Sequence, residues 1–225
     1  MKILNKAIIN KPPYKQSERC EDMSAGSSKL EMHFDTLKEI SNIGTAHALT
    51  ALSQLLQRNF RMTVPNVNFV EFKDVANFVG GAETLILGVL VNVSGDMNGM
   101  VMFLVKQDSA HNLLDILLGQ SSATNGDGTE FTDMELSTLT EVGNILVSSY
   151  LGSLASMMNK KIVPSVPQLA VDMANAVLSV PAIEFGRVAD KALFIESVFG
   201  TEGANVSGYF IFVPEMESFE RMFSF

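Results

Sequence analysis

Several features that mark common protein classes are scarce or missing in this sequence. Its single cysteine, Cys20, excludes an internal disulfide bond and favours a reducing compartment. No apolar run approaches the roughly 18–20 residues needed to cross a bilayer, and residues 85–93 form a run only as long as a strand. Residues 1–13 interleave lysines and asparagines with short apolar runs, which excludes a secretory signal. We therefore expect a cytoplasmic protein without a membrane segment.

Positive charge is also scarce. Lys and Arg number 16 against 25 Asp and Glu, which leaves a net charge of −9. Such an acidic surface repels nucleic-acid phosphates and anionic membranes, so we expect neither as a partner. The three histidines, His33, His47 and His111, lack the spacing of a metal site, and we expect no metal or cofactor of the chain's own. His47 follows Ile40 and Ile43 on an apolar stripe, which predicts a packed side chain.

Apolar residues make up 47% of the chain, enough for a substantial core, but they are unevenly distributed. Residues 1–30 hold two adjacent prolines, a charged patch and a run of small polar residues, which together predict a flexible tail. Residues 119–130 are rich in Gly, Ser, Asn and Asp and predict a linker. Two stretches of similar length are left, residues 31–118 and 131–225.

These two stretches repeat the same order of expected elements. Each begins with a long helix of apolar periodicity, over residues 32–60 and 132–159, followed by a proline and an alternating strand. Next come two apolar strands around a glycine turn and a short amphipathic helix. The expected ranges are 84–93, 99–105 and 109–118 in the first stretch and 192–199, 207–213 and 215–223 in the second. Two α-β-β-β-α repeats predict an α/β (α+β) fold: a pseudo-two-fold single domain with an antiparallel sheet and two long helices packed on one face.

One polar pattern occurs in both long helices. A polar residue, a glutamate and an asparagine stand at positions i, i+4 and i+7, so they share one face of the helix, and a proline follows later. The members are Asp35, Glu39, Asn42 and Pro65 in the first copy and, shifted by 102 positions, Ser137, Glu141, Asn144 and Pro167 in the second. An ordinary solvated face is an alternative interpretation, because Glu and Asn are common there and a duplication can preserve such a face.

This pattern, Asp/Ser-x3-Glu-x2-Asn-x22-Pro, resembles the signature of the CheC/CheX/FliY family of phosphatases. The helix segments EISNIG (39–44) and EVGNI (141–145) resemble the family's helix motif, and residues 64–67 and 167–173 resemble its strand entries. The likeness covers about residues 33–225. Two complete copies of the signature, and a chain that stops soon after its last expected helix instead of adding a rotor domain, favour the CheC type within this family.

The resemblance implies a chemotaxis enzyme that removes the aspartyl phosphate from a CheY-like response regulator. Such a receiver supplies the electrophile and a bound Mg²⁺, so the reaction needs little beyond an oriented water and stabilised charge. A carboxamide can accept a hydrogen bond from the water and donate one to a phosphoryl oxygen, and we assign this role to Asn42 and Asn144. The resemblance further implies that Glu39 and Glu141 pair with the receiver's active-site lysine.

The remaining members of the pattern are expected to support the local structure. Asp35 and Ser137 are expected to cap or steady the first helical turn. Pro65 and Pro167 are expected to end the helix and start the strand.

Two alternatives to a receiver phosphatase stay open. One is a non-catalytic docking module that regulates a CheD receptor deamidase: residues 168–180 resemble the stretch implicated in that contact, with Asp172 as a candidate anchor. A plain strand followed by a turn fits the same residues. The other is a flagellar-switch phosphatase of the FliY type that lacks its rotor domain. Intact Glu and Asn residues in both helices favour catalysis, and we expect a monomer.

Overall fold

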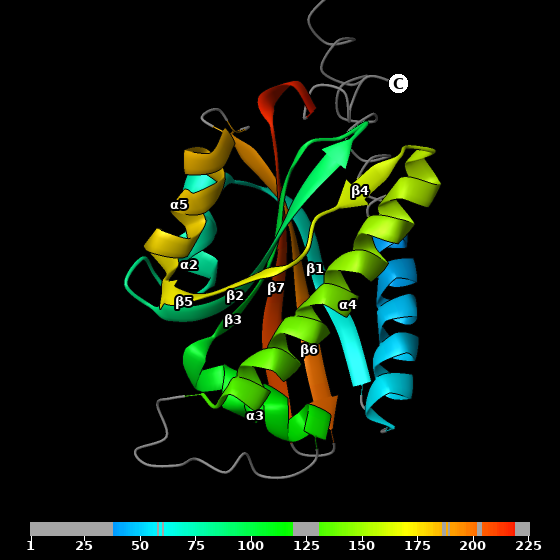
Figure 1. Cartoon of the computed structure of the whole chain (residues 1–225), viewed down its shortest axis with the longest axis vertical. Coiled ribbons are helices and arrows are strands. Elements are labelled where there is room, and N and C mark those ends of the chain that lie inside the picture. The colour runs from blue at the N-terminus through cyan, green and yellow to red at the C-terminus, as the bar shows by residue number, and fades with distance from the viewer. Residues whose placement is uncertain are drawn as a thin grey trace, which may run out of the picture. The chain divides into compact units, whose positions relative to one another are not determined.

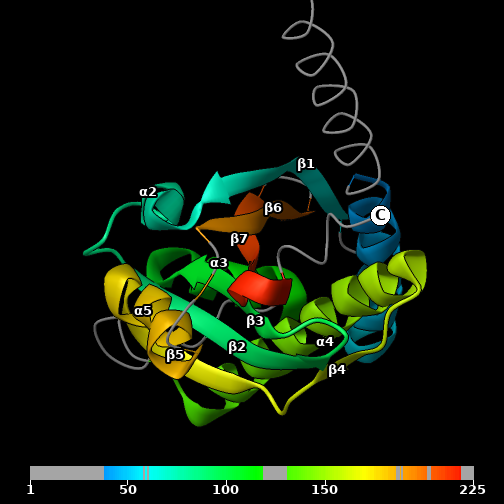
Figure 2. The same ribbon diagram turned by 90° about the horizontal axis from the view of Figure 1, so that it is seen from above.

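The strands of this protein form one antiparallel sheet with helices on both of its faces (Figures 1 and 2). The structure, a computed structural model, describes residues 38–57, 59, 61–118, 131–185, 188, 190–201 and 204–218. All of these residues belong to one unit, Leu37–Phe225. The predicted tail, the predicted linker and Asp35 lie outside the described residues.

Both predicted long helices and both predicted strand pairs are confirmed. Residues 38–56 are helical, and the elements that follow are β1 (Arg61–Glu71), the 3-10 helix η1 (Phe72–Asp74), α2 (Val75–Phe78), β2 (Leu85–Gly95), β3 (Gly99–Lys106), α3 (Gln107–Leu118), α4 (Asp133–Met158), β4 (Ile162–Pro164), β5 (Gln168–Met173), α5 (Ala174–Phe185), β6 (Lys191–Thr201) and β7 (Ala204–Pro214). The patterns did not predict η1, α2, β4 or α5. Of the last predicted helix, residues 216–218 are helical, Glu215 instead forms an isolated bridge with Val188, and residues 219–223 lie outside the described residues.

Strands from the two halves of the chain are interleaved in the sheet. The strand order is β1-β6-β7-β3-β2-β4, and β5 also pairs with β2. β3 pairs with β7 at the centre, β1 pairs with β6 of the other half, and β5 pairs with β2 of the other half. The antiparallel sheet is thus confirmed, and β1 has no strand of its own half beside it. A two-fold relation between the halves stays a prediction.

Alternation along the strands sends apolar side chains to both faces of the sheet. Val89 and Phe103 pack on one face with residues of the helix at 38–56, of α3 and of α4. Their neighbours Leu90 and Met102 pack on the other face with residues of α2 and α5. Figure 2 shows the sheet between these two groups of helices. The prediction that both long helices pack on one face is confirmed.

The long helices end at residues in the left-handed conformation rather than at prolines. Gln57 (φ 53°) and Asn159 (φ 49°) directly follow the last helical residues, and they occupy equivalent positions under the shift of 102. Pro65 lies inside β1, close to an irregularity in the β1–β6 register, where an edge strand tolerates a missing N–H. Pro167 immediately precedes β5. The prediction that these prolines end the helices is therefore wrong, although Pro167 does stand at a strand entry.

The α4 helix begins with a capping box and not with Ser137. Thr132 is the N-cap: its Oγ1 accepts a hydrogen bond from the N–H of Glu135 at 3.3 Å, and Glu135 Oε2 accepts from the N–H of Thr132 at 2.8 Å. Ser137 is exposed in the second turn, so the prediction that it caps or steadies the first turn is wrong. The Thr-x-x-Glu spacing was the available signal.

Candidate functional site

The polar stripe of the first long helix, residues 38–56, faces away from the core. Glu39 and Asn42 are exposed, whereas Ile40 and Ser41 between them are 3% and 1% exposed. Residues three apart lie on the same side of a helix, so the carboxylate and the carboxamide share one solvent-facing surface. Neither side chain has a hydrogen-bond or ion-pair partner among the described residues. Within this part of the chain, both are available to a second molecule.

The second stripe, on α4, has the same orientation. Glu141 is exposed and Asn144 is half-buried, whereas Val142 and Gly143 between them are buried. A β-carbon on Gly143 would lie 2.6 Å from Cγ2 of Val89 on β2, closer than side-chain atoms pack. Only glycine lets α4 approach the sheet this closely, so Gly143 fixes the distance from the sheet at which the second Glu/Asn pair is held.

The two long helices contact each other close to the first pair, two to three residues after Asn42. A β-carbon on Gly44 would lie 2.6 Å from Cδ1 of Tyr150, so the tyrosine ring fills the space beside this glycine. Thr45 Oγ1 donates to the carbonyl oxygen of Ser41 at 2.6 Å and lies 3.0 Å from the Tyr150 hydroxyl, which lies 3.1 Å from Ser197 Oγ. With one proton on each hydroxyl, Ser197 donates to Tyr150, which donates to Thr45. This chain of hydrogen bonds links the first long helix, α4 and β6.

Burial raises the pKa of Tyr150 above its usual 10.0, and the hydrogen bonds with Ser197 and Thr45 oppose the increase. The phenol therefore stays neutral at physiological pH and keeps its proton for the hydrogen bond to Thr45. The sequence patterns did not predict this network, because its three members are far apart in the chain. A tyrosine within the apolar stripe of a long helix was the only local signal.

His47 and His111, the two histidines among the described residues, do not form a site, and His33 lies outside these residues. His47 is exposed, so the prediction that it packs is wrong: the buried positions run through Ala48 and Leu52 and leave His47 at the rim. His111 is half-buried and stacks on Phe131 at 4.2 Å between ring centroids. Among the described residues, no group of three or more His, Cys, Asp and Glu could hold a metal ion. No helix in the described ranges is long and apolar enough to cross a membrane.

The predicted anchor Asp172 is exposed on β5 and does not belong to either of the long helices that carry the Glu/Asn pairs. Its Oδ1 accepts a hydrogen bond from the N–H of Met173 at 2.7 Å. The strand expected over these residues is confirmed, but the expected turn after it is wrong, because α5 begins at Ala174. Val171 and Met173 beside Asp172 are 43% and 49% exposed, so this strand carries uncovered apolar surface.

The Glu/Asn pairs on the long helices have a limited chemical repertoire. Each offers a carboxylate, which only accepts hydrogen bonds, and a carboxamide, which both accepts and donates. Neither group is a strong nucleophile, and both reach the solvent-facing side of their helix, with Asn144 the only half-buried member of the two pairs. Such a pair can orient a water and contact a cationic group, but the reacting centre has to be brought by a molecule that docks on the helix.

The comparisons with known proteins point to the same two helices. The sequence model of the CheC-like family matches residues 32–69 and 134–171, two segments that are again offset by 102 positions. Each segment contains one complete Glu/Asn pair and the proline that follows it.

The similarity to individual proteins extends beyond these segments. A protein of Bacillus subtilis (strain 168) named CheY-P phosphatase CheC is 32% identical over 203 residues, which cover 89% of this chain and 97% of that protein. The flagellar motor switch phosphatase FliY of the same organism is 26% identical over 139 residues, 62% of this chain but 35% of that protein. The solved structure of Thermotoga maritima FliY, 22% identical, aligns with a TM-score of 0.62 over 84% of this chain and 92% of its own, which shows a shared fold.

Proposed function

The chain belongs to the CheC-like family, and from this premise we propose that it is a phosphatase that hydrolyses the aspartyl phosphate of a CheY-like response regulator in chemotaxis. One observation carries the proposal. Both Glu/Asn pairs are intact and lie on solvent-facing helix surface, in a chain that is 32% identical to a CheY-P phosphatase over 97% of that protein's length. A docking module without catalysis would not need both asparagine amides.

Asn42 and Asn144 are proposed to position the attacking water. The carboxamide oxygen accepts a hydrogen bond from the water, and the carboxamide N–H donates to a phosphoryl oxygen of the receiver. The water oxygen then bonds to phosphorus as the bond between phosphorus and the aspartate oxygen breaks. The aspartate leaves as a carboxylate, and both protons of the water leave with the phosphate as dihydrogen phosphate. Holding a reactant in line contributes several kcal/mol in favourable cases, so one amide can have a large effect.

Glu39 and Glu141 are proposed to orient the complex by pairing with the lysine of the receiver's active site. Both carboxylates are exposed and have no hydrogen-bond or ion-pair partner among the described residues, so no existing contact has to be broken first. A charge-assisted hydrogen bond in a partly dried interface is stronger than an exposed ion pair. In this proposal the Mg²⁺ belongs to the receiver, and the chain acts as a cytoplasmic monomer with no metal of its own.

Phosphate release from a phosphorylated CheY-type receiver, measured with and without this protein, tests the proposal. We expect the protein to accelerate the release at substoichiometric amounts in the presence of Mg²⁺. We expect no significant hydrolysis of p-nitrophenyl phosphate, because the site is complete only when a receiver is docked. A receiver that loses phosphate at its own rate in the presence of the protein contradicts the proposal, as does robust hydrolysis of the small ester.

A second candidate function is docking of a CheD-type receptor deamidase on β5. The exposed Asp172 and the uncovered Val171 and Met173 favour it. On such a strand the apolar side chains offer contact area, and the single charge can fix how a partner strand is aligned. Calorimetric titration with a purified deamidase tests it: binding that weakens in Asp172→Ala is expected, and no heat of binding contradicts it.

A further inference from the structure

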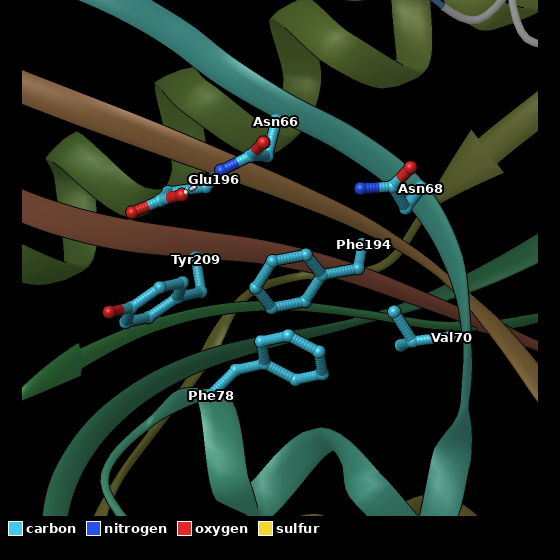
Figure 3. Close-up of a pocket in the computed structure, with 7 residues that line it drawn as sticks. All are labelled: Asn66, Asn68, Val70, Phe78, Phe194, Glu196 and Tyr209. Carbon is cyan, nitrogen blue, oxygen red and sulfur yellow. Dashed lines mark hydrogen bonds between the residues drawn. The ribbon is translucent and has the colours of Figure 1, made fainter.

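A pocket opens on the face of the sheet opposite to the two long helices (Figure 3). Residues of β1, α2, β6 and β7 line a space of about 270 Å³. Phe194 and Tyr209 of this lining belong to the core beneath α2 and α5, whereas Leu193 and Ile195 belong to the core beneath the long helices. The volume is close to the lower end of small-molecule sites, about 300 Å³. The pocket is therefore separate from both Glu/Asn pairs and suits a small group.

The charge in this pocket is a half-buried carboxylate, Glu196, without a counter-charge. Asn66 Nδ2 donates to Glu196 Oε2 at 2.6 Å, and this neutral amide is its only hydrogen-bond partner among the described residues. No Lys or Arg within the described ranges forms an ion pair with it. Figure 3 shows Asn66 and Glu196 side by side, with the amide of Asn68 next along β1. A carboxylate partly withdrawn from water is stabilised by a cation, so the site favours a positively charged ligand.

Aromatic rings form the other part of the lining. The centroids of Phe78 and Phe194 are 4.7 Å apart, and those of Phe194 and Tyr209 are 5.6 Å apart. Phe78 is 45% exposed, so part of its ring is open to a ligand. Burial, and then the charge of Glu196, raise the pKa of Tyr209 above its usual 10.0, so its hydroxyl stays neutral. Aromatic rings beside a carboxylate are a combination that recognises organic cations.

The rest of this sheet face is closed by apolar side chains. The 12-residue helix α5 lies over β2 so closely that a β-carbon on Gly88 would be 3.1 Å from Cγ1 of Val177. The helix α2 has only four residues and leaves the β1–β6 end of the face uncovered. At this end Asn66 and Asn68 are exposed, and Glu196 beside Asn66 is half-buried. The feature that points to a ligand is the half-buried carboxylate of Glu196 beside the aromatic rings of an open pocket.

We propose that this pocket binds a guanidinium group, carried either by a small organic cation or by an arginine side chain of a partner protein. The planar N–H donors of a guanidinium match a carboxylate and amide oxygens, while its flat face stacks on an aromatic ring. A compact ammonium group makes fewer of these contacts at once. The net charge of −9 adds a long-range attraction for any cation. The proposal does not depend on the phosphatase function, because the pocket uses none of the residues assigned to it.

Titration of the full chain with n-butylguanidine, followed by NMR of the side-chain amides, tests the proposal. We expect saturable shifts for Asn66 and Asn68 and at least about tenfold weaker binding in Glu196→Gln, which keeps the shape but removes the charge. The neutral isostere n-butylurea should not bind. The matched control is Glu184→Gln. Glu184, on α5, also accepts a hydrogen bond from an asparagine, Asn92 on β2, but is not part of the lining of this pocket, so this variant should bind as the parent does.

A second arm distinguishes the sources of the guanidinium. Tighter binding of a capped Gly-Arg-Gly peptide than of n-butylguanidine assigns the pocket to a partner's arginine, and the reverse assigns it to a small cation. Phe78→Leu, a change at an exposed ring, should also weaken binding and serves if Glu196→Gln proves unstable. The proposal is overturned by the absence of saturable binding of both probes, by equal binding of n-butylurea, or by equal affinities of the parent, Glu196→Gln and Phe78→Leu.

Discussion

Individual side chains divide the proposed reaction between chemistry and binding. An asparagine amide adds little contact area but fixes a water, whereas a glutamate brings a charge into the interface. The two asparagines also differ in their surroundings, since Asn42 is exposed and Asn144 is half-buried. Kinetics should therefore separate the two roles: removing the glutamate charge should change the affinity for the receiver, and removing the asparagine amide should change the turnover.

Replacing Glu39 and Glu141 together by glutamine should weaken receiver binding as well as turnover. A hydrogen bond to a charged group contributes about 1.5–3 kcal/mol, so we expect KM for the phosphorylated receiver to rise about tenfold or more. The dependence of KM on salt should also become shallower, because a charge pair has been removed. Steady-state kinetics at several salt concentrations measure both, with Glu184→Gln as an exposed control on the other side of the sheet. An unchanged KM would show that the glutamates are not in the interface.

Tyr150 should make the stability of the protein depend on pH in the alkaline range. Its pKa is raised by burial in the folded state, so the folded protein holds the phenol proton more tightly than the unfolded chain, whose pKa is near 10.0. This contribution is complete below pH 10.0 and is lost as the pH rises through the folded pKa. Urea unfolding should be measured below pH 10.0 and at higher pH. The unfolding free energy should fall less between the two conditions in Tyr150→Phe than in the parent. Identical losses in the variant and the parent would refute this role.

Helices and strands with a clear period could be predicted from the sequence, and elements without one could not. The apolar period of α4 predicted residues 132–159, which agrees with the observed Asp133–Met158 to within one residue at each end. The helix α5 has Pro181 inside it and an exposed Ile183, which together hide its buried stripe. The helix α2 has four residues and one buried side chain, too few to show a period. Short helices on the second face were therefore missed.

The candidate site shows the same division. Both Glu/Asn pairs could be located from sequence, because each residue of the first pair has its counterpart in the second pair 102 positions later. Sequence alone could not show that Glu39 and Glu141 are exposed, nor that Tyr150 reaches Thr45 and Ser197. Contacts between residues from three different elements depend on the tertiary fold, and no local pattern encodes them.

Two glycines on α4 provide a matched test of how closely this helix has to approach the sheet. Gly143→Ala places a β-carbon against Val89, a stiff β-branched residue, and should lower the unfolding free energy by about 1–3 kcal/mol. It should also reduce turnover, because Asn144 is the next residue. Gly152 is exposed with no atom within 4 Å, so Gly152→Ala should raise the unfolding free energy by about 0.5–1 kcal/mol. Urea denaturation checks both, and effects of the same sign would contradict the proposed contact.

At the scale of the whole molecule, one sheet carries two copies of the proposed site. The strands of both halves are interleaved, and the hydrogen bonds through Tyr150 connect both long helices to β6. Each helix nevertheless has its own complete Glu/Asn pair on its solvent-facing side. We therefore expect each copy to act on its own receiver molecule, so that Asn42→Ala or Asn144→Ala alone leaves substantial activity.

The central claim is tested most directly by the rate of phosphate release from a phosphorylated CheY-type receiver with the double variant Asn42→Ala/Asn144→Ala. We predict a loss of acceleration of about a hundredfold or more, toward the receiver's own rate, while binding of the receiver is retained. The control, Gln54→Ala/Ser156→Ala, changes two exposed polar residues of the same helices that are also 102 positions apart, and should keep the parental rate. A double asparagine variant that releases phosphate as fast as the parent would contradict the proposed catalytic role.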